Sequence, residues 1–393
     1  MPLNKTLLII LLSMVFILNP LFFILFIGLL SPYLTSIEKK LAAFICVTFA
    51  IVFYSTLQPF GDLAEYLHVY NQINNIDLFN YKRFGMGVEI FILLLMKIVY
   101  FVSNGNEFAF LFSVYSVIFA LLIKICKKID NDFYILLFLT VFFSYGFVQS
   151  NSYFLRQIIS ILFVFLMFLS VKKISVITYC FLAVTSHVSG LLSICVYVAY
   201  SLKNNKKMVL LILLLSIVSI IISYKLGFLD YVIYKLESAT QKFSLLSLVQ
   251  IISYSIPFVV IFYFLYKYRI YISKDKSSSL IIIFSIVNFI LFWGFIKVPA
   301  MSNRFALFMC AFPSILLAPI LKGYVTHLFR FKILLVILFL NIIPMFYTLY
   351  FVELKGSELN FLNYQPISSG ILDIINILLD RISGALPYLS QGN

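Results

Sequence analysis

Two arginines lie at the starts of apolar segments, where they could bind an anion. Arg156 and Gln157 follow a predicted polar turn at 149–152, and Arg304 follows the polar pair at 302–303. If each segment is a helix that starts outside a membrane, unpaired backbone N–H groups and the positive end of the helix dipole lie beside the guanidinium. An arginine fork suits phosphate oxygens better than a lysine does. We therefore expect a phosphate site at the outer surface. The alternative, for either arginine alone, is an interfacial residue that reaches lipid headgroups.

A polar helix is predicted from Asp62 onward. Asp62, Tyr66 and Tyr70 are four residues apart, so they share one helical face. A carboxylate accepts hydrogen bonds from sugar hydroxyls, and tyrosine rings cover the C–H face of a pyranose. This face is therefore a candidate sugar-binding surface, with Asp62 as a candidate catalytic group. The alternative is a helix that Asp62 caps, with its tyrosines at a membrane interface.

Two further side chains are candidates for proton transfer. Glu89 lies in an apolar helix near the predicted outer surface, where partial loss of solvent favours proton uptake and suits a general base. Its alternative role is an ion pair with Lys82 or Arg83. His187 lies in a turn among Thr and Ser residues and could orient a substrate hydroxyl or carry a proton. A hydrogen-bonded structural histidine is the alternative there.

No metal or cofactor motif accompanies these residues. His68, His187 and His327 do not have a metal-ligand spacing. The D-N-D string at 130–132 is similar to the D-x-D of metal-dependent glycosyltransferases, but it directly precedes an apolar segment and is interpreted as a helix start. Walker and dinucleotide-binding motifs are absent, as is a basic aromatic surface for nucleic acid. We predict a protein with no metal, no cofactor and no nucleic-acid partner.

The composition places these residues in a membrane protein. Of the 393 residues, 63% are hydrophobic and 11% are charged, and the mean hydropathy is +1.07. Soluble domains are about 45–50% apolar and about 25% charged. The difference excludes a cytosolic enzyme, a disordered chain and a secreted disulfide scaffold. Because one crossing takes roughly 20 apolar residues, the chain has room for about a dozen.

The hydropathy pattern predicts an all-α, polytopic fold with about twelve transmembrane helices in a single domain, 1–393. Ten apolar runs each suit one crossing. The run at 174–202 is too long for one helix, and its polar centre predicts two short helices that meet at a turn. The ten runs are 7–30, 41–58, 107–123, 133–149, 157–171, 208–224, 248–268, 278–296, 304–321 and 333–350.

Basic residues give these helices a direction. Seventeen of the 29 Lys and Arg residues fall in six clusters between alternate apolar runs, which predicts that those loops are cytoplasmic. The net charge of +14 is therefore interpreted as a topology signal. The outer side then holds 59–106, 225–247 and the tail 351–393. The basic clusters are at 39–40, 124–128, 172–173, 203–207, 267–276 and 322–332.

One apolar run does not fit this count. Residues 87–102 would reverse the charge pattern if they crossed, and the run contains Glu89 and Lys97. A charge near the bilayer centre costs about 2.5 kcal/mol or more. We therefore predict a re-entrant or interface-lying helix on the outer side. In the tail, the amphipathic stretch 371–382 is expected to lie along the outer surface.

Five short motifs follow one another in a recognisable order. They are G-D-x-x-x-Y-x-x-x-Y from Gly61, E-x-F-x-x-L from Glu89, R-Q at 156–157, H-x-S from His187 and N-R ending at Arg304. Together they resemble the EpsG-like branch of bacterial Wzy-type polysaccharide polymerases. Relatives often have E-P-G-F where this chain has E-I-F, so the resemblance is incomplete at Glu89.

The resemblance implies a GT-C-like glycosyltransferase. Such an enzyme polymerises undecaprenyl-pyrophosphate-linked oligosaccharide repeats on the periplasmic or outer face of the bacterial cytoplasmic membrane, for O-antigen, capsule or exopolysaccharide. Arg156 and Arg304 would stabilise the leaving pyrophosphate, and Glu89, Asp62 or His187 would accept a proton. Inversion at the anomeric carbon without a metal is expected. Membrane lipids and a chain-length regulator protein are implied as partners.

Two other functions stay open at this point. About twelve helices also suit a flippase for lipid-linked sugars, although the one-sided polar residues and the lack of internal repeats favour a transferase. An O-antigen ligase or another GT-C transferase would share the lipid-linked donor and differ in its acceptor. Sequence alone separates these enzymes poorly.

Overall fold

The chain is all-helical wherever the computed structural model describes it. The described residues are 5–57, 62–79, 81, 88–202, 251, 255–256, 258–260, 262–263, 266–267, 276–317, 325–355 and 369–388. Within these ranges every regular element is an α-helix or a short 3-10 helix, and none is a strand. The predicted all-α class is confirmed.

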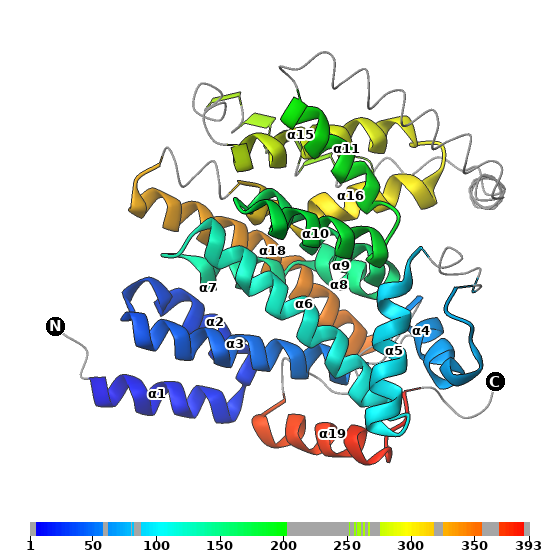
Figure 1. The fold of residues 1–393 in the computed structure, drawn as a ribbon. Helices are drawn as coiled ribbons and strands as arrows, with labels where there is room; N and C mark the ends of the chain where they lie inside the picture. The colour runs from blue at the N-terminus through cyan, green and yellow to red at the C-terminus, as the bar shows by residue number, and fades with distance from the viewer. Residues whose placement is uncertain are drawn as a thin grey trace.

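A densely packed bundle surrounds helix α9 (Leu155–Phe168). Each residue of α9 from Gln157 onward is buried, because the helix is apolar on all sides and has neighbours all around it. Those neighbours are α6 (Glu107–Ile129) and α10 (Lys173–Ser186), and α6 in turn packs along α3 (Ser36–Thr56). Figure 1 shows α3 and α6 running through the middle of the molecule.

Three of the described helices are long and apolar enough to cross a membrane. They are α6, α15 (Lys276–Gly294) and the stretch His327–Phe346 of α18 (His327–Lys355), and they match the predicted runs at 107–123, 278–296 and 333–350. A bent pair of helices, α7 (Tyr134–Phe142) and α8 (Tyr145–Tyr153), makes a fourth if the two count as one crossing. The chain is a helical membrane protein, and the total of about twelve crossings remains a prediction.

Three runs that were predicted as single crossings are broken within the described residues, and one of them, 304–321, is interrupted at Phe312. Residues 7–30 form α1 (Lys5–Leu18) and α2 (Pro20–Leu30), because Asn19 accepts a hydrogen bond from the Phe22 N–H at 3.1 Å and Pro20 occupies the first turn. An asparagine cap followed by proline starts a new helix, so the single-helix prediction was wrong here.

The second break lies at Ser144. It separates α7 (Tyr134–Phe142) from α8 (Tyr145–Tyr153), and the two helices are bent by 65°. The polar stretch at 149–152, which the sequence suggested was a turn, therefore lies within a helix. This correction matters for the site, because α8 turns directly into α9 at Phe154.

The predicted turn at His187 is confirmed. Helix α10 ends at Ser186, and α11 (Gly190–Leu202) starts after three intervening residues. A Cβ on Gly190 would lie 2.9 Å from the backbone of Ala183 and 3.0 Å from Ser160 Oγ. Only glycine permits so close an approach, so this turn is fixed against α9.

Four more helices complete the part of the fold that bears on the site. They are α4 (Asp62–Asn71), α5 (Ile90–Ser103), α16 (Pro299–Ala311) and α19 (Ile371–Ser383). Helix α16 packs on α8 and α15, and α19 packs on α1, α3 and α6. In Figure 1, α5 stands across the direction of α6. The predicted crossing at 208–224, most of 248–268 and the loop 225–247 lie outside the described residues.

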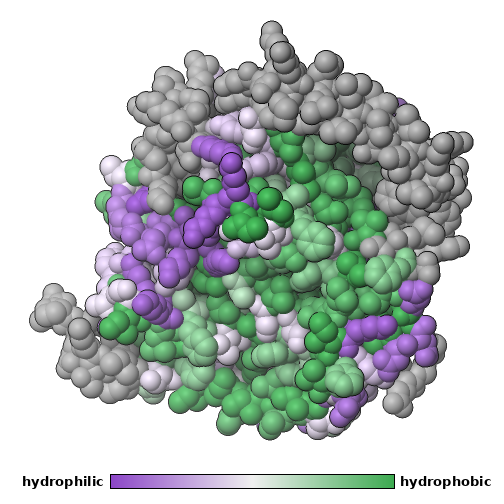
Figure 2. Space-filling model, in the orientation of Figure 1, coloured by the Kyte–Doolittle hydropathy of each residue, from purple (hydrophilic) through white to green (hydrophobic). Residues whose placement is uncertain are grey.

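Charged side chains gather at the end of the bundle where α3, α7 and α18 begin. Arg330 donates to Asp130 at 2.7 Å and to Asp132 at 3.4 Å, and Lys39 donates to the Asp132 carbonyl at 3.4 Å. The D-N-D string is therefore held by an arginine just before α7 starts. Figure 2 shows hydrophilic side chains at the left and lower right of the molecule, with a hydrophobic surface between them.

Candidate active site

Glu89 and Arg156 form the centre of a polar cluster. Glu89 directly precedes α5, and Arg156 is the second residue of α9. Arg156 Nη1 donates to Glu89 Oε2, and the two side chains are 14% and 7% exposed. Charges with so little solvent are stable only when they are paired. The predicted partners of Glu89, Lys82 and Arg83, lie outside the described residues, and the partner found here is Arg156.

The second oxygen of Glu89 faces the turn between α10 and α11. Glu89 Oε1 accepts a hydrogen bond from the Val188 N–H at 2.9 Å, and His187 Nε2 lies 3.6 Å away. The Ser189 N–H donates to His187 Nδ1 at 3.1 Å. Nδ1 also lies 2.7 Å from Ser189 Oγ. A backbone N–H can only donate, so we assign Nδ1 as the acceptor for both groups, which places the proton of a neutral imidazole on Nε2.

Tyr66 connects α4 to this pair. Arg156 Nε donates to the Tyr66 hydroxyl at 2.7 Å, and the guanidinium lies 5.7 Å from the centre of the ring. Burial raises the pKa of Tyr66, and Arg156 only partly opposes that effect. The hydroxyl therefore stays protonated at neutral pH. Arg156 is held by a carboxylate on one side and a phenol on the other, so its direction is fixed before any ligand arrives.

Arg304 approaches the same cluster from α16. It interacts electrostatically with Arg156, Asp62 and Glu89, and its guanidinium lies 5.5 Å from the centre of the Phe154 ring. Helix α16 starts at Pro299, so Arg304 lies in its second turn. The sequence suggested instead that Arg304 lies at the start of the helix, beside its first free N–H groups. Its Nε is buried and has no hydrogen-bond partner among the described residues. A buried guanidinium nitrogen of this kind is prepared to donate to an anion.

Close packing of α8 against α16 sets the position of Arg304. A Cβ on Gly146 would lie 2.9 Å from the backbone carbon of Cys310, and Ser144 Oγ donates to the Cys310 carbonyl at 2.8 Å. The two helices can therefore touch only because residue 146 is glycine. This contact brings α16 against α8 and places Arg304 near Phe154, the residue before α9.

Gln157 lines a small cavity beside Arg304. The cavity has a volume of about 10 Å³ and is also lined by Ser150, Phe154 and Phe312. Gln157 Oε1 is buried without a hydrogen-bond partner in the described structure. A space of this size accommodates about one water molecule. Gln157 thus lies next to the guanidinium, and its amide N–H groups, not this oxygen, could donate to phosphate, so its predicted role in phosphate binding stays a prediction.

Tyr70 is separate from the cluster, although it shares a helix with Tyr66. Its side chain is fully buried, its ring stacks on Phe110 at 4.8 Å, and its hydroxyl lies 3.2 Å from both Ser103 Oγ and the Asn106 carbonyl. In this arrangement neither face of the ring is open to a sugar. Tyr70 holds α4 against α5 and α6, so we do not include it in the functional proposal.

The sequence missed two features of this cluster. One is the Val188 N–H, a backbone donor that no side-chain pattern reports. The other is the direct contact of Tyr66 with Arg156, because periodicity predicts the face of a helix and not the residue opposite it. Asp62 lies within electrostatic reach of both Tyr66 and Arg304, so every candidate except Tyr70 belongs to one group.

A comparison with known protein families shows which family this chain belongs to. The EpsG family profile matches residues 39–366, a range that includes all the site residues from Asp62 to Arg304. The chain belongs to the EpsG family. Members of the EpsG family are polysaccharide polymerase-like membrane proteins, so a role in polysaccharide biosynthesis follows. Neither the curated proteins nor the solved structures that were compared contain a match to this EpsG family chain.

Proposed function

We propose that this EpsG family protein is a membrane glycosyltransferase that polymerises oligosaccharide repeats carried on undecaprenyl pyrophosphate. The observation that supports this most strongly is the cluster of Arg156, Glu89, Tyr66, His187 and Arg304 at one end of the helical bundle. Two cations, a candidate base and a fixed imidazole are the groups that such a transfer needs. We place this end at the outer face of the bacterial cytoplasmic membrane.

The two arginines bind the pyrophosphate of the donor. As the glycosidic bond to phosphate breaks, its electron pair leaves with the pyrophosphate, and negative charge develops on the leaving oxygen. Arg304, whose buried Nε has no hydrogen-bond partner in the described part of the chain, and Arg156, oriented by Tyr66, are positioned to stabilise that charge. Donors of this kind contribute about 3–4 kcal/mol each to transition-state stabilisation.

Glu89 accepts the proton from the acceptor hydroxyl. In the absence of substrate its carboxylate neutralises Arg156. A pyrophosphate carries more charge than a carboxylate and competes for the guanidinium, so donor binding releases Oε2 of Glu89. The acceptor oxygen then forms the new bond to the anomeric carbon while its proton passes to Glu89. In this way the base becomes available only when the donor is bound.

His187 and Asp62 have supporting roles in this scheme. The Val188 N–H keeps the Glu89 carboxylate in position by a hydrogen bond, and His187 presents its Nε2 toward the same oxygen at 3.6 Å. Asp62 lies near Arg304 and Tyr66 and can accept a hydrogen bond from a sugar hydroxyl. If Glu89 is not the base, these two are the next candidates.

The lipid tails of both substrates lie against the apolar outer surface of the helices, as membrane lipids do. Transfer proceeds with inversion and without a metal, and a chain-length regulator protein acts as a partner. Each of these statements comes from the family resemblance. A chelator added to the purified protein tests metal independence.

Reconstitution tests the proposed activity. The purified protein in liposomes is given lipid-linked repeat, and products are separated by length. We expect a ladder of longer glycans from the wild type, and at least a roughly 100-fold lower rate for Arg304→Ala. His68→Ala, an exposed change on α4 away from the cluster, is the control and should match the wild type. A wild-type protein that never lengthens the glycan contradicts the proposal.

A flippase makes a different prediction in the same vesicles. It would move lipid-linked repeat between leaflets without changing its length. It would also expose positions 156 and 304 to each side of the membrane in turn. If cysteines placed at positions 156 and 304 react with a label from one side of the membrane only, both with and without substrate, the result favours the polymerase.

A further inference from the structure

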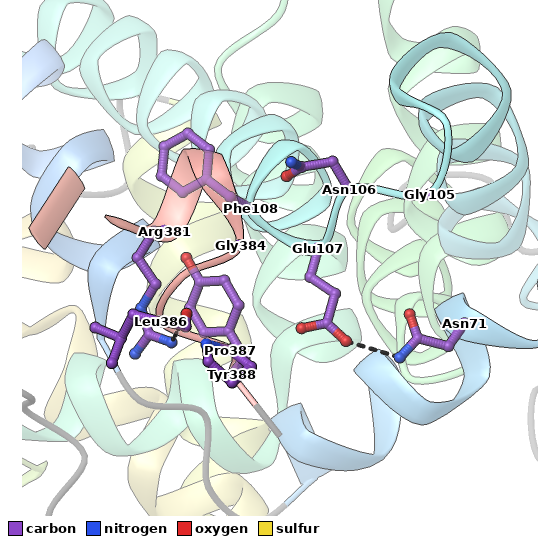
Figure 3. A pocket seen from close by; sticks show the side chains of 10 residues that line it. All are labelled: Asn71, Gly105, Asn106, Glu107, Phe108, Arg381, Gly384, Leu386, Pro387 and Tyr388. Carbon is purple, nitrogen blue, oxygen red and sulfur yellow. Dashed lines mark hydrogen bonds between the residues drawn. The ribbon is translucent and has the colours of Figure 1, made fainter. Parts of the chain in front are cut away.

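A second polar pocket lies a short way along α4 from the candidate active site. It has a volume of about 400 Å³, within the range of roughly 300–1,000 Å³ that is usual for ligand sites. It is formed where α4, the α5–α6 connection and the segment after α19 meet (Figure 3). The residues that line it are Asn71, Gly105, Asn106, Glu107, Phe108, Arg381, Gly384, Leu386, Pro387 and Tyr388.

The pocket is joined to the active site by a single rigid helix. Tyr66 of α4 contacts Arg156, and Asn71 at the end of α4 lines the pocket. Five residues of α-helix correspond to a rise of about 7.5 Å. Tyr70, between them, is locked in the core by Phe110. Because Tyr66 and Asn71 belong to one α-helix and point about 140° apart around its axis, the pocket has a fixed position relative to the reacting groups, on another side of α4.

Its polar groups suit hydroxyls. Asn71 Nδ2 donates to Glu107 Oε1 at 2.7 Å, and Figure 3 shows these two side chains pointing toward each other along one side of the pocket. Asn71 is exposed and Glu107 is half-buried, so both can reach a ligand. An amide and a carboxylate side by side donate to and accept from neighbouring hydroxyls of one sugar. Phe108 and Pro387 supply apolar surface beside them.

Its charges do not suit phosphate. Among the described lining residues Arg381 is the one cation, and it is only 2% exposed, so little of it is presented to a ligand. Nη1 donates to the Leu386 carbonyl at 2.9 Å, and the guanidinium lies 3.8 Å from the centre of the Tyr388 ring. Glu107, in contrast, carries a negative charge at the pocket wall. The lining therefore favours a hydroxyl-rich ligand without negative charge over a lipid phosphate.

We propose that this pocket is a glycan subsite that binds an uncharged sugar of the lipid-linked chain beyond the sugar that reacts. The inference rests on the proposed polymerase function, because that function supplies an extended oligosaccharide next to Tyr66. The subsite holds the glycan while the pyrophosphate is held by the arginines. The sugar belongs either to the incoming repeat or to the growing chain, and the kinetics below distinguish the two.

Blocking the pocket tests the subsite. Asn71→Trp fills it from an exposed position, and Gln72→Trp, at the exposed neighbour that does not line the pocket, is the matched control. In liposomes we expect Asn71→Trp to raise KM for lipid-linked repeat about tenfold if the sugar belongs to the incoming repeat. If it belongs to the growing chain, products shorten while KM is unchanged. Asn71→Trp with the KM and product lengths of Gln72→Trp overturns the proposal.

A binding measurement separates this proposal from the proposed function. The probe is the oligosaccharide that mild acid releases from the host's lipid-linked intermediate, labelled at its reducing end. We expect it to bind the full-length protein, and to bind Asn71→Trp at least about tenfold more weakly than Gln72→Trp. Equal binding by the two variants, or none by the wild type, overturns the subsite. If the wild type binds the probe at this pocket and yet never lengthens a glycan, only the polymerase proposal fails.

Discussion

Glu89 and Arg156 form a buried ion pair that joins the start of α5 to the start of α9 across 67 positions of the sequence. The pair fixes both groups before substrate arrives and keeps either charge from being left alone in a region of low solvent access. In the proposed mechanism the pair also couples donor binding to proton acceptance, because an anion that binds Arg156 releases the carboxylate of Glu89.

Replacing Glu89 by Gln should slow turnover strongly and also lower stability, because Arg156 loses its charged partner. The amide keeps the size of the side chain and can accept from the Val188 N–H, but it cannot take up a proton. We expect kcat to fall by about 10²–10⁴-fold, the usual contribution of general acid–base catalysis. Product formation from lipid-linked repeat in liposomes measures it. Undiminished turnover would assign the base to Asp62 or His187.

Replacing Tyr66 by Phe should weaken donor binding more than it slows transfer. The change removes the acceptor of the 2.7 Å hydrogen bond from Arg156 Nε and leaves the ring in place. A hydrogen bond to a charged group contributes about 1.5–3 kcal/mol, so we expect KM to rise by at least about tenfold. The pH profile should not change, because the Tyr66 hydroxyl stays protonated. A normal KM would show that Tyr66 does not orient Arg156.

Hydropathy and helix-end signals predicted much of the fold. Helices α6, α15 and α18 lie where long apolar runs predicted them, and the polar centre at His187 correctly predicted a turn. The break at Asn19 could also have been predicted, since an asparagine cap followed by proline is a helix start. The break at Ser144 has a weaker signal, a serine with a glycine two residues later inside an otherwise apolar run.

Replacing Gly146 by Ala should destabilise the contact between α8 and α16. The added Cβ would lie 2.9 Å from the Cys310 backbone, so the helices must separate. Overpacking costs about 1–3 kcal/mol, which exceeds the helix-propensity gain of about 0.5–1 kcal/mol. Thermal unfolding in detergent should show a lower Tm, with reduced activity because Arg304 moves.

Gly294→Ala is the matched control for that change. Gly294 also lies in a helix, and an added Cβ there meets no atom within 4 Å. Its Tm should equal or exceed that of the wild type. If both variants behave alike, the close approach at Gly146 does not position α16.

Replacing Arg330 by Met should destabilise the opposite end of the bundle without changing the chemistry. It leaves the buried Asp130 carboxylate without its 2.7 Å partner, which costs about 3–5 kcal/mol. Adding Asp130→Asn removes the unpaired charge and should restore much of the lost stability. Thermal unfolding of the single and double variants measures both effects. Activity per folded molecule should stay unchanged, and its loss would place this pair in the catalytic machinery.

The contacts within the site lay beyond sequence reasoning for a physical reason. Spacing along a helix predicts which residues share a face, as it did for Tyr66 and Tyr70, but it does not predict what covers that face. Phe110 packs on Tyr70, whereas Arg156 contacts Tyr66. The packing of α4 against its neighbours thus determines that Tyr66 belongs to the site and that Tyr70 belongs to the core. Residue types identified the candidates, and tertiary packing selected among them.

Binding of undecaprenyl pyrophosphate tests the central claim most directly. The claim is that Arg156 and Arg304 hold one diphosphate together. We predict that Arg156→Ala and Arg304→Ala each raise Kd for this lipid by at least about tenfold. The double variant should lose less binding free energy than the sum of the two single losses, because both arginines contact the same group. A Kd unchanged by either substitution, or effects that add as those of independent sites do, would contradict the account.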